Sequence, residues 1–495
     1  MRRQESAPAG VVPLARRPPG LSTAGRTGLE HLDWWRPRSV RFVENDPPGS
    51  ALSAFLESLR TTFEDGGHHV VGHAAASATD LALAVVRVPE GSAPLSERVE
   101  EAPMPLLLRM RRTHGALGNI AHSVAVVEVP ERMSTMSHAE AVHTGRVLMA
   151  RLGAPKVVVV TVDATTDRVI EATLCTMEGG HPSETENTKN TEKTENTDSI
   201  AQGICDRLVA AACTREVAGR YDVESGAITA AQWADTSVPE ALAAAGRRMG
   251  GLRLLPAPHR LTHYVSPRLA AVYERYLGMK AFSEGMLFAF DPGLGALVVT
   301  ASGSWEVDKR ALRRDDVTVV AHRLDNGRLR VLAPVSVSPK GPSVEAWEVC
   351  ALLEAVPTVR IRQDEDGAWI WDPHGTHEVP AIRAGLHAHV GVSAADPSRI
   401  ETVPADRERY PYGFGCGTDL MIEVAQDTVR RSQAINDPDD PRHFVRWPML
   451  YHGEMAVELW GPDQRTEPLS GLLDLFDTQA EAAITYDPDH IEQPW

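Results

Sequence analysis

The sequence predicts a multi-domain α/β protein. Three features support this prediction: a length of 495 residues, short valine-rich runs that alternate with helical patterns in the first third, and a polar low-complexity stretch that follows them. A chain of this length accommodates two to four domains, each with its own core. Hydrophobic residues make up 43% of the chain and charged residues 24%, which is ordinary for a globular protein.

The N-terminus has the composition of a disordered arm. Residues 1–34 are rich in proline, glycine and arginine at their start, and they lack the apolar core of a signal peptide. We expect this arm to precede the first domain, because a segment with few large apolar residues cannot offset the entropy lost on ordering.

Residues 35–180 are expected to form an α/β domain. Segment 50–65 has apolar residues at helical spacing, and 138–153 has the pattern of a helix that ends at Gly153. The expected strands are 80–88, 105–110, 122–129 and 156–163. Near-continuous valine runs separated by helices favour a largely parallel sheet that is buried on both faces. This layout resembles a Rossmann-like domain, although no GxGxxG follows the first strand, so we expect no dinucleotide site of the usual kind.

A boundary follows this domain. Residues 181–198, HPSETENTKNTEKTENTD, contain no apolar side chain beyond one proline, which predicts a low-complexity linker or loop. Residues 199–280 contain three stretches with helical spacing, and we expect this region to be mainly helical.

Residues 281–495 are expected to form an α+β domain that carries the candidate site. Segment 316–334 predicts a β-hairpin that turns at Asp325, Asn326 and Gly327, and 358–372 predicts a second hairpin that turns at Asp366–Gly367. A helix over about 343–355 separates the two hairpins.

Charge and cysteine content limit the classes of partner. The formal net charge of −17 argues against nucleic acid or an anionic membrane as the main partner. No apolar run approaches the roughly 20 residues that span a bilayer. The five cysteines are dispersed and include no CxxC pair, which fits a reducing compartment and excludes a zinc ribbon. We expect a cytoplasmic protein that binds a small-molecule substrate, with an oligomer open as a possibility.

Two histidine-bearing segments predict a metal site. If 379–392 is a strand, His387 and His389 point to the same face, an arrangement that metalloenzymes use to place two nitrogens about one ion. In a strand over 449–460, His452 and Glu454 also share a face.

A shared site requires these two segments to meet. His387, His389 and His452 would then be ligands of a divalent Zn, Mn or Fe ion, with Glu454 as a ligand or general base. The alternative is that the histidines are hydrogen-bonded or solvated at the end of a strand.

The segment YPYGFGCGTDLM (410–421) predicts a helix entry. Thr418 suits the N-cap position, and Gly413, Gly415 and Gly417 lie in the loop before it, where backbone N–H groups can gather an anionic part of a substrate. Asp419 in the first turn disfavours a phosphate, and the absence of a following lysine excludes a Walker-type loop. The alternative is a tight turn.

Cys416 lies just before that helix, where a thiolate would be stabilised. With a histidine as base it becomes a candidate nucleophile, although buried inert cysteines are common. Ser302 and Ser304, in TASGSW, follow a predicted strand and are candidates to bind a polar ligand. Glu284, Asp308 and His452 occur in an order loosely similar to the manganese ligands of sugar isomerases of the fucose and arabinose type, but no motif of that family matches residue by residue.

Three hypotheses of function follow. The first is a metal-dependent enzyme that hydrolyses a small polar metabolite or interconverts an aldose and a ketose. The second is a transferase or hydrolase that depends on Cys416, and the third is a non-catalytic ligand-binding or scaffold protein. The histidine groups at 66–73 and 112–122 could bind metal, but histidines in glycine-rich segments are usually solvated, and we expect these to be solvated.

Overall fold

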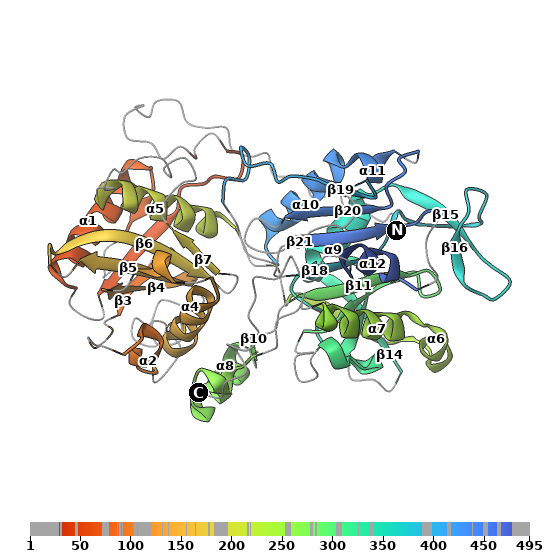
Figure 1. The fold of residues 1–495 in the computed structure, drawn as a ribbon, viewed down its shortest axis with the longest axis horizontal. Coiled ribbons are helices and arrows are strands. Elements are labelled where there is room, and N and C mark those ends of the chain that lie inside the picture. The colour runs from red at the N-terminus through yellow and green to blue at the C-terminus, as the bar shows by residue number, and fades with distance from the viewer. Residues whose placement is uncertain are drawn as a thin grey trace, which may run out of the picture.

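The computed structural model of the protein describes most of the chain between Leu29 and Asp477. The described residues are 29, 32–44, 48–71, 79–86, 88, 91, 93–102, 106, 120–130, 132–136, 138–154, 156–163, 165–176, 179–182, 197–214, 217, 219–252, 259–277, 281–282, 285–302, 309–324, 326–335, 340–388, 398–412, 417–437, 439–448, 454–462 and 467–477. Within them, helices and strands are mixed throughout, and the strands form two large sheets that lie side by side (Figure 1).

The first sheet is mixed and has seven strands in the order β2-β1-β3-β4-β5-β6-β7. Neighbouring strands from β2 to β5 are parallel, and β6 and β7 are added antiparallel. The strands are β1 Ser39–Glu44, β2 His69–Val70, β3 Thr79–Val86, β4 Ile120–Val129, β5 Lys156–Asp163, β6 Arg168–Thr176 and β7 Gly179–Pro182. Six consecutive residues of β5 are buried, because helices cover both faces of the sheet at this strand. Of the expected strand 105–110, only Leu106 is among the described residues.

Helices pack on both faces of this sheet (Figure 1). Helices α1 (Ser50–Asp65) and α5 (Thr197–Cys213) lie together on one face, where their apolar residues join Phe42 and Leu81 in a core. Helices α2 (Leu95–Arg98) and α4 (His138–Leu152) cover the other face. Helix α4 ends at Gly153, whose φ of 68° is a conformation that glycine adopts without strain, as the sequence predicts.

The second sheet has nine strands in the order β19-β20-β21-β18-β11-β12-β13-β14-β8. Neighbouring strands are antiparallel except β8–β14 and β19–β20, which are parallel. The strands are β8 Tyr221–Ile228, β11 Met286–Asp291, β12 Ala296–Thr300, β13 Val317–Arg323, β14 Leu329–Pro334, β18 Ile382–Ala388, β19 Ile400–Thr402, β20 Phe444–Pro448 and β21 Glu454–Leu459.

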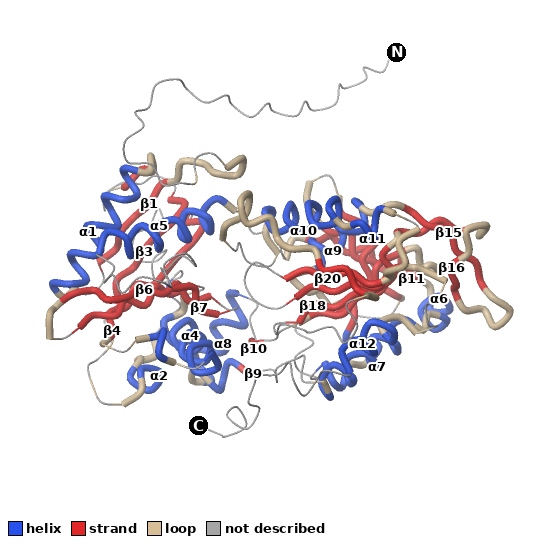
Figure 2. Tube along the Cα trace, turned by 45° about the horizontal axis from the view of Figure 1, so that its top comes forward, coloured by secondary structure: helices blue, strands red, loops and turns tan. Residues whose placement is uncertain are grey.

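This sheet is also covered on both faces (Figure 2). One face packs against α9 (Ala346–Ala355), α10 (Asp419–Arg431) and α11 (Gln433–Asn436). The opposite face packs against α6 (Ala230–Asp235), α7 (Val238–Gly251) and α12 (Ser470–Asp477). Two expected features of this region are confirmed: β13 and β14 form a hairpin through Asn326–Gly327, and α9 follows it.

A small three-stranded sheet extends from the second sheet (Figure 1). Its order is β16-β15-β17, with β15 at Thr358–Gln363, β16 at Trp369–Trp371 and β17 at His377–Pro380. Strands β15 and β16 form the second expected hairpin, which turns at Gly367 with a φ of 81°. Its inner face contacts Trp460 at the end of β21.

The helices of the expected helical region 199–280 do not form one unit. Helix α5 packs on the first sheet, and α6 and α7 pack on the second. Helix α8 (Pro267–Leu277) lies against α4, where the hydroxyl of Tyr273 donates to the carbonyl oxygen of Ala150 at 2.5 Å. The region also contains β8 and β9 (His259–Arg260), which pairs with β10 (Ala281–Phe282) just beyond the region. Amphipathic helices do not encode which sheet they cover, so this division required the tertiary structure.

The expected N-terminal arm and the expected linker both overlap packed structure at their ends. Leu29, Leu32 and Trp34 are buried in the core, so the end of the expected arm 1–34 is packed; residues 1–28 lie outside the described part. Of the expected linker 181–198, β7 includes the first two residues and α5 begins at Thr197, while 183–196 are outside the described part.

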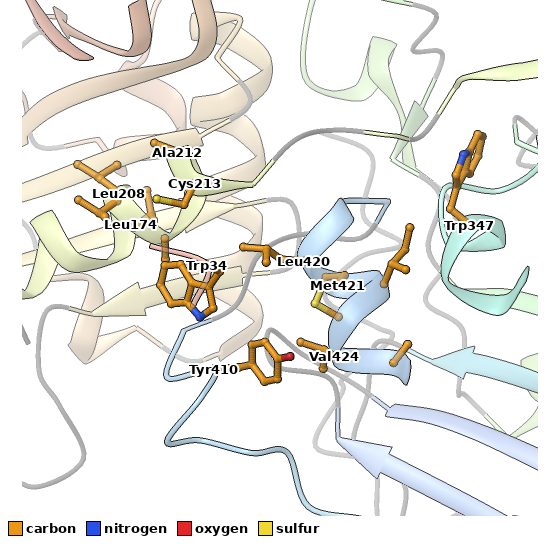
Figure 3. Close-up of a cluster of buried hydrophobic side chains, with 14 of the residues drawn as sticks. Trp34, Leu174, Leu208, Ala212, Cys213, Trp347, Tyr410, Leu420, Met421 and Val424 are labelled. Carbon is orange, nitrogen blue, oxygen red and sulfur yellow. The ribbon is translucent and has the colours of Figure 1, made fainter. Parts of the chain in front are cut away.

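One apolar cluster joins the two sheets (Figure 3). Trp34, before β1, and Leu208, in α5, contribute from the side of the first sheet. Tyr410, in the segment before α10, and Leu420, in α10, contribute from the side of the second. The indole Nε1 of Trp34 also donates to the carbonyl oxygen of Arg409 at 2.8 Å. The two sheets therefore share a buried contact.

Gly246→Ala is expected to destabilise the protein. A Cβ atom at this position in α7 would lie 2.1 Å from the carbonyl oxygen of Lys309, and a backbone atom cannot rotate away. We expect the free energy of unfolding to fall by roughly 1–3 kcal/mol, measured by urea denaturation. Gly251→Ala in the same helix is the matched control, because nothing lies within 4 Å of its Cβ position; an equal loss in both variants would contradict the steric explanation.

Protonation of His68 is expected to lower the free energy of unfolding at acidic pH. This side chain is buried, its Nδ1 accepts the N–H of Arg38 at 3.1 Å, and burial together with the charge of Arg38 lowers the pKa of His68 to about 4. An unfolded histidine has a pKa near about 6.5, so the unfolded chain binds the additional proton between the two values. The contribution of neutral His68 to the free energy of unfolding is therefore complete above pH about 6.5. It is lost as the pH falls towards 4, and the loss amounts to at most about 3 kcal/mol.

Denaturation of the wild type and His68→Gln between pH 4.5 and 7 tests this expectation. The variant should show a shallower loss of stability with acid, while His322→Gln, at an exposed position of β13, should follow the wild type. A slope that is identical in wild type and His68→Gln would refute the assignment.

Candidate functional site

The described residues include five of the eleven predicted site residues. These are His387, Glu454, Gly417, Thr418 and Ser302. The other six lie outside the described part of the chain: His389, His452, Cys416, Gly413, Gly415 and Ser304.

His387 is fixed by a backbone carbonyl on the neighbouring strand. It lies in β18, is only 1% exposed, and its Nδ1 is 3.2 Å from the carbonyl oxygen of Glu454 at the start of β21. A carbonyl oxygen can only accept, so Nδ1 carries the hydrogen in this contact. In the neutral ring the lone pair is then on Nε2, which is the state in which histidine binds a metal through that atom.

The Glu454 carboxylate lies on the other face of the sheet. The register pairs Ala388 with Glu454 and His387 with Met455, and directly opposed residues share a face. The carboxylate of Glu454 is 3.4 Å from the guanidinium of Arg446 on β20. The described strands therefore do not bring the ring of His387 and the carboxylate of Glu454 to one point, because an odd offset in register reverses the face.

The loop before α10 is used to join the two sheets. Gly417 has a φ of 73°, its N–H donates to the buried carboxylate of Glu348 at 2.7 Å, and its carbonyl oxygen accepts the N–H of Val217 at 2.9 Å. Thr418 caps α10 as predicted, by accepting the N–H of Met421. An acidic side chain of the protein thus takes the place that the sequence suggested for an anionic ligand at Gly417.

A polar chain continues from this loop into the first sheet. Asp419 accepts the hydroxyl of Thr214 at 2.9 Å, and the carbonyl oxygen of Thr214 is 3.2 Å from Nε2 of His122, which therefore donates. His122 is buried in β4, contrary to the expectation that the histidines of 112–122 are solvated. We refer to Glu348, Gly417, Asp419, Thr214 and His122 as the joint.

Little in the sequence indicates the joint. Its members lie in β4, just after α5, in α9, and in the last turn before and the first turn of α10, and no spacing along the chain relates them. For Glu348 the available signal was its position between Trp347 and Val349 in a helix whose neighbouring residues are apolar, which indicates an acid on a buried face.

The start of α1 provides a second place where a helix N-terminus meets an acid. The N–H of Gly49 is 3.3 Å from Oε2 of Glu128, which lies near the carboxyl end of β4, and Ser50 donates to Asp167. Carboxylates therefore lie beside the positive end of this helix. This arrangement disfavours a phosphate there, in agreement with the missing glycine-rich motif.

Ser302 is exposed just beyond β12, and its N–H donates to the carbonyl oxygen of Gly341 at 2.7 Å. The hydroxyl remains compatible with the predicted binding role. Of the predicted site residues, the structure brings His387 and Glu454 together through the backbone carbonyl of Glu454, while the carboxylate of Glu454 pairs with Arg446.

Burial limits the chemistry of four cysteines. Cys175, Cys205, Cys213 and Cys350 are all buried, and burial raises the pKa of each thiol. A thiol with a raised pKa is a poor nucleophile at neutral pH. Among the described residues, no group of three or more histidine, cysteine, aspartate or glutamate side chains is placed to hold a metal ion.

No protein-family model matches the chain, and searches of curated proteins and of solved structures gave no significant match. Within the described part, no helix is both long and apolar enough to cross a membrane.

Removing the Thr214–Asp419 hydrogen bond is expected to weaken the joint. A double-mutant cycle with Thr214→Val and Asp419→Asn should give a coupling energy of about 1–2 kcal/mol, because the hydroxyl donates to a carboxylate in a partly buried place. The free energies of unfolding supply the four values of the cycle.

A cycle of Thr214→Val with Asp427→Asn is the matched control. Asp427 lies on the same helix but pairs with Arg431, so these two changes should be additive within about 0.5 kcal/mol. A coupling of similar size in both cycles would show that the effect is not specific to the joint.

Proposed function

We propose that this chain is a cytoplasmic metal-dependent enzyme that acts on a small polar metabolite, with a divalent Zn, Mn or Fe ion held by His387, His389 and His452. Hydrolysis and aldose–ketose isomerisation are the reaction types that suit such a site. We also propose that each large sheet and its helices form a domain, a Rossmann-like one near the N-terminus and an α+β one that carries the site.

The observation that carries the proposal is the pairing of β18 with β21. Ala388, the last residue of β18, is opposite Glu454, the first residue of β21. His389 follows Ala388 directly in the sequence, and His452 precedes Glu454 by two residues. The two histidine-bearing segments are thus attached to neighbouring strands at the same end of the sheet, which is the proximity that shared ligation requires.

The contact of His387 also supports the proposal. Histidine ligands of metals commonly donate their second ring N–H to a backbone carbonyl, which sets the tautomer and the ring orientation. The Nδ1 contact of His387 with the Glu454 carbonyl oxygen has this form. Among the described residues, the carboxylate of Glu454 faces away from His387, so the role we retain for Glu454 is to orient this imidazole through its backbone.

A divalent ion at this place would activate a water or polarise a substrate carbonyl. Three imidazoles carry no negative charge, so the ion keeps its full charge for an anionic or strongly dipolar substrate. The predicted binding residues Ser302, Ser304 and Thr418 would then serve only to position that substrate.

Metal content of the purified full-length protein tests the proposal. After incubation with each metal and removal of excess, we expect about one Zn, Mn or Fe per chain. His387→Gln, which keeps a similar side-chain volume, should lower metal affinity by more than the roughly 10–100-fold that loss of a second-shell partner costs.

His322→Gln is the matched control, since it removes an exposed histidine from the same sheet. Circular dichroism of both variants separates a lost ligand from a lost fold. Stoichiometric metal that is unaffected by His387→Gln, or no metal in the wild type, would refute the proposed site and favour the Cys416-dependent or the non-catalytic hypothesis.

A further inference from the structure

The longest edge strand of the described structure is β8. It ends the nine-stranded sheet and contains eight residues, Tyr221–Ile228. The other edge strands of the three sheets with more than two strands are β2, β7, β19, β16 and β17, which have two to four residues each. Long edges are unusual in monomers, because an open row of backbone groups can pair with another chain.

The outer side of β8 presents backbone groups in register. The N–H of Leu329 on β14 donates to the carbonyl oxygen of Arg220, so the even-numbered residues 220, 222 and 224 direct their backbone groups towards β14. Tyr221, Val223 and Ser225 consequently direct their N–H and C=O groups away from the sheet. The carbonyl oxygen of Tyr221 accepts from the guanidinium of Arg328 at 2.8 Å, so the open part of the edge begins at Val223. Within the described residues, no further strand lies beyond them.

Asp222 and Glu224 place charge on this strand, but other devices that protect an edge are missing over most of it. The sequence YDVESGAI contains no lysine and no proline, which natural edges use against pairing. Five consecutive residues, 222–226, are exposed, so both faces of the strand are open to solvent. Irregularity is confined to its end, where Gly226 has a φ of 72° and the register with β14 shifts.

Exposed apolar side chains gather at the same edge. Three large hydrophobic residues are strongly exposed in the described part of the chain: Val223 at 41%, Val335 at 49% and Val344 at 42%. Val223 is in β8, Val335 follows β14 and lies 3.9 Å from the Cβ position of Gly226, and Val344 precedes α9. Val223 and Val335 thus lie at one edge, and neighbouring exposed apolar side chains are the pattern of an interaction site.

The charges of this edge are neutralised within the chain. Asp222 pairs with Arg328 at 2.6 Å, and Glu224 pairs with Arg330 on β14. The whole chain has a net charge of −17, so two copies repel each other over most of their surfaces. At the edge formed by β8, arginines of the same chain neutralise the acidic side chains, so two copies can approach there with less repulsion.

We propose that β8 is a homodimer interface, in which the strand pairs antiparallel with β8 of a second copy across a two-fold axis. An antiparallel arrangement follows from the symmetry, because a two-fold axis perpendicular to the sheet reverses the strand direction and keeps each face on its own side. The pairing satisfies the outward groups of Val223 and Ser225 and joins two nine-stranded sheets into one. It covers Val223 with the same region of the partner.

The mass of the protein in solution tests the proposal. Size-exclusion chromatography with light scattering at micromolar concentrations should give twice the chain mass of 53.8 kDa. Val223→Lys places a charge on the edge and should give 53.8 kDa under the same conditions, with an unchanged circular dichroism spectrum. Gln363→Lys is the matched control: it adds the same charge to an exposed position of another strand, and it should remain a dimer.

Hydrogen exchange adds a local measurement. In the wild type, amide exchange of the peptide containing 221–225 should slow as concentration rises, whereas in Val223→Lys it should be independent of concentration. A wild-type monomer, an assembly larger than a dimer, or a dimer that Val223→Lys leaves intact would overturn the proposal.

Discussion

The structure depends on the joint at the start of α10. Gly417 uses its N–H for a carboxylate on α9 and its carbonyl oxygen for the backbone of Val217, so one glycine connects a helix of the second sheet with the segment that follows α5 of the first. Its φ of 73° is a conformation that a side chain would strain, which explains why glycine occupies this position. An apolar cluster that includes Trp34, Tyr410 and Leu420 joins the two sheets beside the start of α10 (Figure 3).

The same joint changes the meaning of the glycine-rich segment 410–421. Three glycines before a capped helix suggest an anion site, because helix N-termini present unpaired N–H groups. In the protein, two acids serve that helix entry: Glu348 accepts from Gly417, and Asp419 lies in the first turn and accepts from Thr214. The start of α1 repeats this arrangement with Glu128 at Gly49. Intramolecular carboxylates at helix entries are consistent with the acidic net charge of −17.

The candidate metal site and the edge strand illustrate two consequences of sheet geometry. Pairing of β18 with β21 attaches two distant histidine segments to one end of the sheet, yet the register places the side chain of Glu454 on the face opposite His387. Strand β8 lies between helices in the sequence, and it forms one edge of the second sheet by pairing with β14, over 100 residues away. Both arrangements depend on which strands pair and in which register. Neither the choice of partner strand nor the register can be recognised from a short stretch of sequence.

The sequence alone determined the local elements. Valine runs gave strands such as β5, apolar spacing gave α1 and α4, Asn326–Gly327 and Gly367 gave hairpin turns, and Thr418 gave a helix cap, because each depends on a few neighbouring residues. Tertiary structure decided the rest. It divided the helices of 199–280 between two sheets, buried His122 and Glu348 in a joint, and separated the ring of His387 from the carboxylate of Glu454. These outcomes depend on contacts between residues far apart in the chain, and the period of a helix or strand specifies which face is apolar but not what packs against it.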